Sequence, residues 1–315
     1  MSESATDPLA LLLVSGSDAG LRGDLIDAIR AMETAEGRDL AIVSGNAEAL
    51  DDDLARVLAV DDIMLAVIEL GDDDDPALVL DTVEPLVEDE AAMLIGALAA
   101  IDAGRFWHDF REGDANAARQ LVAAIEAASL VALAHSQAAD AESLRTLDGF
   151  VRNLNPTAAM LQMEDLARLS LPEISVVIAE AEAAGDESAD SDDELLAGEV
   201  DAWGFNSFTW STEMRLDRGR FLALFEHWPT EVLCAHGVAR FADGATAVLS
   251  VVRDTVAIDE YDGDDHDDHD HAAEVELSGD EDLDLGEDES EIAFVGIGMP
   301  VADLVARLDA CQIET

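Results

Sequence analysis

The segment LALLLVSGSDAGLRGDL, residues 9–25, carries the strongest signal of the fold class in this chain. Its apolar run at residues 9–14 predicts a buried strand, and the amphipathic stretch at residues 21–34 predicts a helix. A strand, a glycine-containing turn and a helix together have the outline of a phosphate-binding turn. The lysine that such a turn needs is missing, so the segment raises the question of whether it still holds a nucleotide.

Short apolar runs alternate with amphipathic stretches along the chain as far as about residue 180. Continuous apolar strands that alternate with helices are typical of a parallel sheet covered on both faces. The predicted fold class is therefore α/β, with a mostly parallel sheet over residues 1–182, although the alanine-rich run 92–101 is also compatible with a helix. The further strands are predicted at residues 40–43, 63–70, 92–101 and 130–134, and the further helices at 115–128 and 141–152.

A smaller second domain is predicted over residues 201–315, after an acidic linker at residues 183–200. Its pattern favours an α+β unit with strands at residues 205–212, 231–241, 246–252 and 291–298 and helices at 217–227 and 301–311. The aromatic residues that gather there are interpreted as its core, and they are Trp203, Phe205, Phe208, Trp210, Phe221, Phe225 and Trp228.

The chain is strongly acidic, since 16 basic residues stand against 72 acidic ones and give a formal charge of −56 over 315 residues. All the basic residues are arginine, and 49% of the chain is apolar, which excludes a disordered polyanion. Concentrated salt screens the self-repulsion of such a charge. We therefore expect a cytoplasmic protein of a salt-accumulating halophile, whose acidity serves solvation. Nucleic acid is excluded as a partner because little basic surface could neutralise phosphates.

The two cysteines, Cys234 and Cys311, lie far apart and form no CxxC motif, so neither a disulfide framework nor a zinc–thiolate cluster is predicted. No apolar run approaches the length of a membrane-spanning helix, and the first residues are acidic rather than signal-like. We therefore expect no membrane partner.

Five motifs follow one another in an order that carries a family resemblance. They are IELGDDDDP (68–76), IDAGRFWHDF (101–110), FVRNLNPTA (150–158), VLCAHGVARF (232–241) and EIAFVGIG (291–298). Together they resemble the CobW-type metallochaperone GTPases, a P-loop class related to UreG and HypB. The resemblance implies a P-loop NTPase-like domain followed by a CobW C-terminal-like α+β domain.

The phosphate loop departs from the pattern of that family, which is G-x-x-x-x-G-K-[ST]. Aligned from Gly16, the chain has Leu21 in place of the second glycine, Arg22 in place of the lysine and Gly23 in place of the hydroxyl residue. The lysine acts as a compact charge on the phosphates, and the hydroxyl holds Mg²⁺. The planar head of arginine does not replace a lysine there. Asp18 and Asp24 also bring negative charge to an anion site.

Two other family motifs are altered as well. Gln137 stands where an aspartate would accept two hydrogen bonds from guanine, and residues 44–50 lack the cysteines of a C-x-C-C metal motif. The three departures from the family pattern together imply that GTP hydrolysis is lost. No catalytic residue is therefore assigned, and neither GTP nor Mg²⁺ is expected as a cofactor. The vestigial nucleotide site that it implies consists of Gly16, Gly20, Arg22, Gly23 and Glu69.

A low-complexity acidic insertion, at residues 259–291, contains one cluster of imidazoles. Imidazole and carboxylate groups are ligands of Zn²⁺, Co²⁺ and Ni²⁺, and a His-rich stretch in this part of the chain is similar to the CobW-type pattern. An acidic, solvated loop without a bound metal is the simpler interpretation. The candidate metal ligands are His266, His269, His271, Asp267, Asp268 and Asp270.

These observations favour a CobW-like metal-handling protein that binds a divalent transition metal and works without GTP turnover. Its expected partner is a metal-recipient protein or an active CobW-type paralogue. Two alternatives remain. One is a weak GTPase that uses Arg22 and Glu69 in altered roles, and the other is a non-catalytic regulatory subunit whose acidic loop serves solubility.

Overall fold

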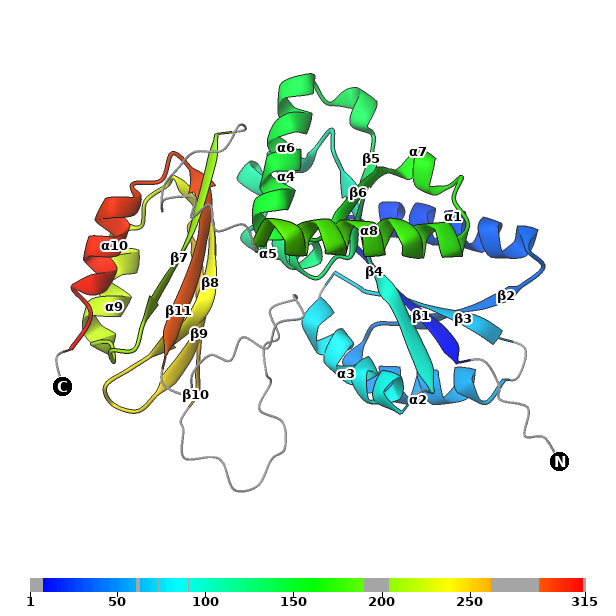
Figure 1. Ribbon diagram of the computed structural model, residues 1–315, viewed down its shortest axis with the longest axis horizontal. Helices are drawn as coiled ribbons and strands as arrows, with labels where there is room; N and C mark the ends of the chain where they lie inside the picture. Colours follow the sequence, from blue (N-terminus) through cyan, green and yellow to red (C-terminus); the bar gives the residue numbers. More distant parts are fainter. Residues whose placement is uncertain are drawn as a thin grey trace. The chain divides into compact units, whose positions relative to one another are not determined.

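The computed structural model describes residues 8–60, 63–72, 74–89, 91–189, 204–261 and 289–313 of the chain. Its contacts divide the chain into two units, Met1–Asp190 and Ser191–Thr315, and each unit is built on its own sheet (Figure 1). Within the described ranges, no helix combines the length and the apolar character that crossing a membrane requires.

The N-terminal unit contains a six-stranded sheet whose neighbouring strands are all parallel, in the order β2-β3-β1-β4-β5-β6. The α/β class predicted from the apolar runs is therefore confirmed, and the alanine-rich run forms a strand. The central strand β1 lies between β3 and β4. The strands are β1 (Leu9–Gly16), β2 (Asp39–Ser44), β3 (Ile63–Glu69), β4 (Ala92–Asp102), β5 (Leu130–Ala134) and β6 (Ala159–Gln162).

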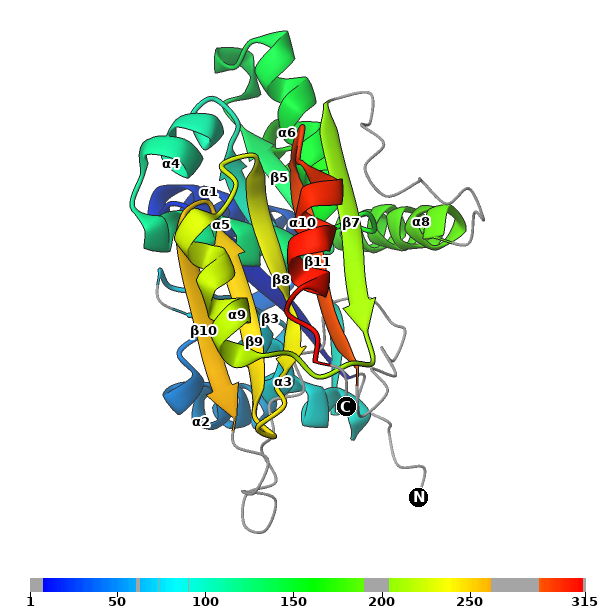
Figure 2. The ribbon, with the colours of Figure 1, turned by 90° about the vertical axis from the view of Figure 1, so that its left-hand side faces the viewer.

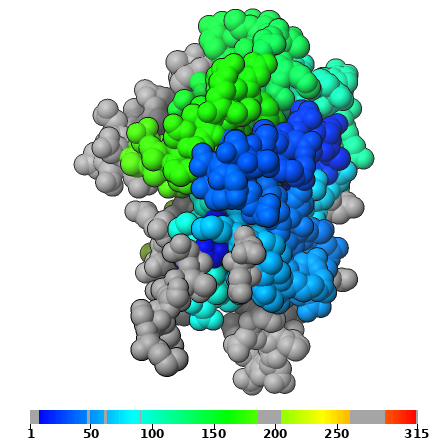
Figure 3. Space-filling model, turned by 90° about the vertical axis from the view of Figure 1, so that its right-hand side faces the viewer, coloured from blue at the N-terminus to red at the C-terminus, as the bar shows by residue number. Residues whose placement is uncertain are grey.

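Helices cover both faces of this sheet. On one face, Leu25 of α1 and Ile178 of α8 belong to the same buried cluster, and Figure 3 shows α1 and α8 lying side by side. On the other face, Leu54 of α2 and Val83 of α3 are buried against the sheet. The helices are α1 (Ala19–Ala35), α2 (Ala47–Leu58), α3 (Pro76–Glu88), α4 (Phe106–Glu112), α5 (Ala115–Glu126), the 3-10 turn η1 (Ser136–Ala138), α6 (Ala141–Leu154), α7 (Met163–Leu166) and α8 (Leu171–Ala189).

An acidic linker is expected at residues 183–200, but α8 continues to Ala189, so residues 183–189 are helical and the rest of the predicted linker lies outside the described residues. Two buried isoleucines, Ile174 and Ile178, fix the first half of α8 to the sheet. Further along, Gly185 lies so close to Thr157 that a Cβ at this glycine would be 2.6 Å from the Thr157 Cγ2 atom. Packing at these positions therefore keeps this segment helical, although its acidic composition resembles that of a linker.

The C-terminal unit contains a five-stranded antiparallel sheet in the order β10-β9-β8-β11-β7. The insertion predicted at 259–291 is shorter at both ends, since β10 continues to Tyr261 and β11 begins at Ser290. The elements are β7 (Phe205–Thr212), α9 (Arg218–Leu224), the 3-10 turn η2 (Phe225–His227), β8 (Val232–Arg240), β9 (Thr246–Val252), β10 (Thr255–Tyr261), β11 (Ser290–Ile297) and α10 (Val301–Asp309).

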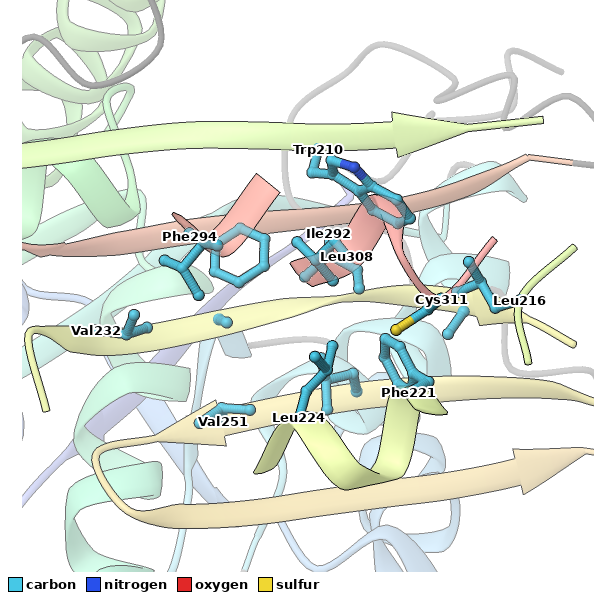
Figure 4. Packing of buried hydrophobic residues seen from close by; sticks show 14 of the residues in the cluster. Trp210, Leu216, Phe221, Leu224, Val232, Val251, Ile292, Phe294, Leu308 and Cys311 are labelled. Atoms are coloured by element: carbon cyan, nitrogen blue, oxygen red, sulfur yellow. The ribbon is translucent and has the colours of Figure 1, made fainter. Parts of the chain in front are cut away.

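An aromatic core lies between this sheet and its two helices, which cover the same face of the sheet (Figure 2). The rings of Phe208 and Phe294 stack with their centroids 4.6 Å apart, and Phe221 of α9 is fully buried (Figure 4). Phe225 and Trp228 pack against this core while they remain partly exposed. The predicted aromatic core is therefore confirmed for Phe208, Phe221, Phe225 and Trp228. Trp203 lies outside the described part of the chain.

Candidate functional site at the carboxyl edge of the parallel sheet

The carboxyl ends of the central strands of the N-terminal unit border a cavity of about 460 Å³. Ligands of open α/β sheets bind in the crevice outside the carboxyl ends of the strands, where the strand order reverses. The cavity is lined by Ser17, Asp18, Gly20, Leu21, Asp24, Asp102, Arg105, Asp109, Gly113, Ala117, Leu121 and His135.

The turn between β1 and α1 is closed by its own aspartate. The Asp18 carboxylate accepts hydrogen bonds from the backbone N–H groups of Gly20, at 2.6 Å, and Leu21, at 3.4 Å. The Asp18 carbonyl accepts the N–H of Arg22 at 3.1 Å. Aspartate is a favoured residue at this capping position because it satisfies the free N–H groups of a first helical turn. Donors that bind phosphate in a phosphate loop are thus occupied by a carboxylate of the chain.

The turn also approaches the next strand very closely. A Cβ at Gly16 would lie 2.6 Å from the carbonyl oxygen of Ala100 in β4, so a glycine is needed at the end of β1. A Cβ at Gly23 would meet no atom within 4 Å, which means that packing does not require a glycine at this position. Gly23 also has no hydroxyl with which to hold a magnesium ion.

Arg22 turns back beneath the same loop, and it is only 4% exposed. Its Nη1 atom donates to the carbonyl oxygen of Gly16 at 2.9 Å and forms an ion pair with Asp72 Oδ1 at 2.7 Å. The Nε atom lies 3.9 Å from Glu69 Oε1. Gly16, Arg22 and Glu69 are therefore brought together, and Asp72 joins them. Asp72 was not singled out from the sequence as a site residue, although it lies in the same IELGDDDDP motif as Glu69.

The position expected to recognise guanine is occupied as well. The side-chain amide of Gln137 donates to both oxygens of Glu164, at 2.8 and 3.0 Å. Beside it, His135 adopts a left-handed backbone conformation, with φ of 52°, and its Nδ1 atom lies 2.9 Å from Asp102 Oδ2. Glu164 was not singled out in the sequence, because it lies 27 residues from Gln137 and no local pattern connects the two.

The charge around the cavity disfavours a polyphosphate. Asp18, Asp24, Asp102 and Asp109 line the cavity with carboxylates, and the guanidinium of Arg105 is paired with Asp109 at 3.0 Å. A nucleoside triphosphate is a polyanion, so a wall of the same sign raises the free energy of its bound state. Both the geometry and the negative charge of the cavity therefore disfavour phosphate binding.

The FVRNLNPTA motif has a structural role in the same unit. Asn155 is 5% exposed, and its Nδ2 atom lies 3.0, 2.9 and 2.9 Å from the carbonyl oxygens of Ile125, Glu126 and Ala128. Its Oδ1 atom accepts a hydrogen bond from the Thr157 hydroxyl at 2.9 Å. The asparagine therefore binds the carbonyl groups at the end of α5, which a helix leaves without partners of its own.

The predicted metal ligands His266, His269 and His271, with Asp267, Asp268 and Asp270, lie outside the described residues. Within the ranges that are described, no group of three or more histidine, cysteine, aspartate or glutamate side chains could hold a metal ion. Both cysteines are buried and neither forms a disulfide, and burial raises the pKa of the Cys311 thiol. A raised pKa keeps that thiol protonated and unsuited to metal binding.

The first unit is thus a parallel α/β domain whose β1–α1 loop is bound by its own side chains, and the second is a small α+β domain. Residues 205–312 match the family model described as the cobalamin synthesis protein cobW C-terminal domain. This match assigns the C-terminal unit to that domain family, in agreement with the resemblance drawn from the motifs at residues 232–241 and 291–298.

Two solved structures are similar in fold over nearly the full chain. One is the Zn(II)-bound YjiA GTPase from E. coli, with 14% identity and a TM-score of 0.40 over 97% of this chain and 99% of that chain. The other is a Zn(II)-bound triple mutant of YjiA GTPase, with 14% identity and a TM-score of 0.41 over the same shares. No curated protein sequence matches the chain.

Proposed function

We propose that this chain is a CobW-type metal-handling protein that does not hydrolyse GTP. The observation that carries the loss of hydrolysis is the position of Arg22, whose guanidinium is buried and bound to Gly16 and Asp72. The lysine of a working phosphate loop places its charge on the β- and γ-phosphates instead. A cation that is already bound to the chain supplies little attraction to a nucleotide.

The rest of the site supports this proposal. Transition-state charge in phosphoryl transfer is stabilised by a metal ion and by positioned cations. Here Gly23 offers no hydroxyl to the metal ion, and the cavity beside the loop is lined by carboxylates. Gln137 is engaged with Glu164 where an aspartate would bind guanine. The groups that would hold the metal ion, the phosphates and the base are therefore each altered in this loop and its neighbours.

The metal-handling half of the proposal rests on the sequence of the insertion. Its ligands would be His266, His269 and His271 together with Asp267, Asp268 and Asp270, and the ion would be Zn²⁺, Co²⁺ or Ni²⁺. The chain would pass its metal to a recipient protein or act beside an active CobW-type paralogue.

Metal titration tests this half directly. Zn²⁺ and Co²⁺ would be titrated by calorimetry in concentrated KCl into the unaltered chain and into the His266→Asn/His269→Asn/His271→Asn variant, which keeps every carboxylate. The control is His108→Asn/His227→Asn, which removes two exposed imidazoles elsewhere. We expect stoichiometric micromolar binding that only the triple variant loses. Equal, weak binding by all three proteins would contradict the metal proposal and favour a regulatory subunit.

The loss of GTP turnover is tested separately. A fluorescent GTP analogue with Mg²⁺ would be added to the unaltered chain in concentrated KCl, and phosphate release would be followed. We expect neither binding at millimolar nucleotide nor phosphate release above background. Measurable binding with slow hydrolysis would instead establish the weak GTPase alternative, in which Arg22 and Glu69 act in altered roles.

A further inference from the structure

The outermost strand of the parallel sheet, β2, has an open edge that is almost free of charge. It pairs with β3 on one side, and no described strand pairs with its other side (Figure 1). Its sequence, DLAIVS, contains one ionisable residue, Asp39, in a chain of formal charge −56. Edge strands are usually protected from pairing by charged residues, proline or a bulge. The register shift between β2 and β3 leaves Met64 of β3 as the extra residue, so β2 itself carries no bulge.

The backbone of β2 directs alternate residues to this open edge. The N–H of Gly45, which follows the strand, donates to the Glu69 carbonyl at the end of β3 at 2.7 Å. In a parallel strand the N–H and C=O groups of successive residues point to opposite sides. Leu40, Ile42 and Ser44 therefore present their backbone groups to the open edge. Ile42 is also 43% exposed, although isoleucine is among the residue types that are most often buried.

From this edge we infer that two copies of the chain associate through their β2 strands, which pair antiparallel about a two-fold axis at Ile42. A two-fold axis brings the same surface of both subunits together, so the edge must be complementary to itself. Outward-facing residues must pair with one another, which places Ile42 opposite the partner's Ile42 and Leu40 opposite the partner's Ser44. In this register all three outward-facing residues of each strand are paired, and the exposed isoleucines cover each other.

The charge pattern of the chain favours this edge as the place where a second copy binds. In the register about Ile42, Asp39 lies opposite the partner's Gly45, so no two carboxylates face each other. The two Asp39 residues are about 20 Å apart along the paired strands, at about 3.4 Å per residue. This separation exceeds the Debye length, which is about 3 Å at 1 M salt. Like charges directly opposite each other would destabilise the pair, and the acidic surface of this chain provides them in abundance.

The edge strand β7 of the C-terminal sheet also lacks charged residues, which makes it the alternative place of contact. Its exposed residues are Ser207, Thr209 and Ser211, so pairing there would cover no exposed large apolar side chain. The removal of apolar surface from water is the dominant favourable term in most protein association. The larger gain therefore comes from β2, where Ile42 is covered.

Gel filtration with light scattering in concentrated KCl tests the association. At high protein concentration the unaltered chain should elute with twice the mass of one chain. Ile42→Asp places two carboxylates opposite each other and should weaken the association about tenfold or more. Ile42→Thr keeps a β-branched residue and should weaken it less. Circular dichroism would establish that both variants are folded.

Two control variants make this result specific to β2. Leu78→Asp introduces the same charge at an apolar residue of α3 that is 50% exposed. Thr209→Asp introduces it at an exposed position of the alternative edge strand, β7. Both control variants should associate as the unaltered chain does.

Cross-linking tests the register of the two strands. The two native cysteines are buried, so an added cysteine reports on its own position. Ile42→Cys places two thiols opposite each other at a Cα separation of about 5.5 Å, within the range that a disulfide spans. Ser44→Cys lies on the same face of the strand, but its two copies would be about 14 Å apart. On mild oxidation, Ile42→Cys should form a covalent dimer and Ser44→Cys should not.

The other outcomes overturn the inference. A single-chain mass for the unaltered protein at high concentration in concentrated KCl would remove it. A dimer that persists in folded Ile42→Asp and Ile42→Thr, or that is lost in Thr209→Asp, would place the contact elsewhere. Equal cross-linking of Ile42→Cys and Ser44→Cys would reject the register. None of these results depends on GTP turnover or metal binding, so the inference and the proposed function can fail separately.

Discussion

The loop between β1 and α1 and the turn that contains Asn155, in the FVRNLNPTA motif, lie in the same unit. Both can be compared with motifs of the CobW-type pattern. In the turn, the asparagine of the motif is present, and its amide binds three backbone carbonyls in a buried position. In the loop, the residues that would face phosphate and magnesium have been replaced, and Arg22 is bound to the chain. The residue that matches the family pattern is thus the one that binds backbone carbonyls of its own chain. The residues that depart from the pattern are those to which the pattern assigns a phosphate or a magnesium ion.

The largest effect is expected from breaking the turn. Asn155→Ala removes the side-chain donor to the Glu126 and Ala128 carbonyls, while the Ile125 carbonyl keeps the N–H of Ala128, and we expect a loss of about 3 kcal/mol in the free energy of unfolding. Urea denaturation followed by circular dichroism measures it. The control is Asn116→Ala, because that side chain is exposed and bound only to Arg119, and it should change stability by about 0.5 kcal/mol or less. Equal losses in both variants would remove the structural explanation of the motif.

A smaller effect sharpens the description of the loop. Arg22→Met removes the donor to the Gly16 carbonyl and a buried ion-pair partner, and we expect it to cost about 2 kcal/mol. Asp72→Asn should cost only about 0.5 kcal/mol, since its carboxylate is largely exposed and water solvates it. Thermal and urea unfolding of the two variants would measure this asymmetry. A larger loss for Asp72→Asn would show that the exposed carboxylate, and not the buried cation, holds the loop together.

The smallest effect concerns Asp140, which caps the helix that leads to Asn155. Hydrogen bonds from the backbone N–H and hydroxyl of Ser143 lower the pKa of this carboxyl below its ordinary value. The ionised form is therefore the stabilising one. Its contribution is present above the ordinary carboxyl pKa and is lost as the pH falls through the lowered value.

Asp140→Asn keeps a capping oxygen and removes the charge. We expect the Tm difference between the unaltered chain and this variant to shrink as the pH is lowered from neutral through that window. Asp51→Asn, which removes an equal charge at an exposed position, corrects for the general effect of charge. A Tm difference that stays constant with pH, after this correction, would contradict the role of the ionised cap.

The sequence predicted the strands of the parallel sheet well, because residues 9–14, 63–70 and 130–134 are continuous apolar runs that both faces of the sheet bury. It predicted the helices around them less completely. Acidic residues dominate α2, and they also fill the second half of α8. In both helices only a few widely spaced apolar residues contact the sheet, so their composition resembles that of a solvated connection.

The candidate site was predictable in its residue types but not in its contacts. The absence of a lysine is visible in the sequence, whereas the return of the Arg22 side chain to Gly16 depends on how tightly the loop packs. The pairing of Gln137 with Glu164 joins η1, which follows β5, to α7, which follows β6, and these two segments meet because β5 and β6 are neighbours in the sheet. Contacts of this kind follow from tertiary structure, which no local pattern contains.

The strand order of the C-terminal sheet bears on how the chain can evolve. The residues between Tyr261 and Ser290 connect the edge strand β10 to the inner strand β11, which pairs with β8 and β7 instead of β10. Their length is therefore not fixed by a tight hairpin, and the closure entropy of a connection grows slowly with its length, by about 0.6 kcal/mol for each doubling. Selection, or an engineer, could therefore lengthen, shorten or exchange this segment while the strand register of the domain stays the same.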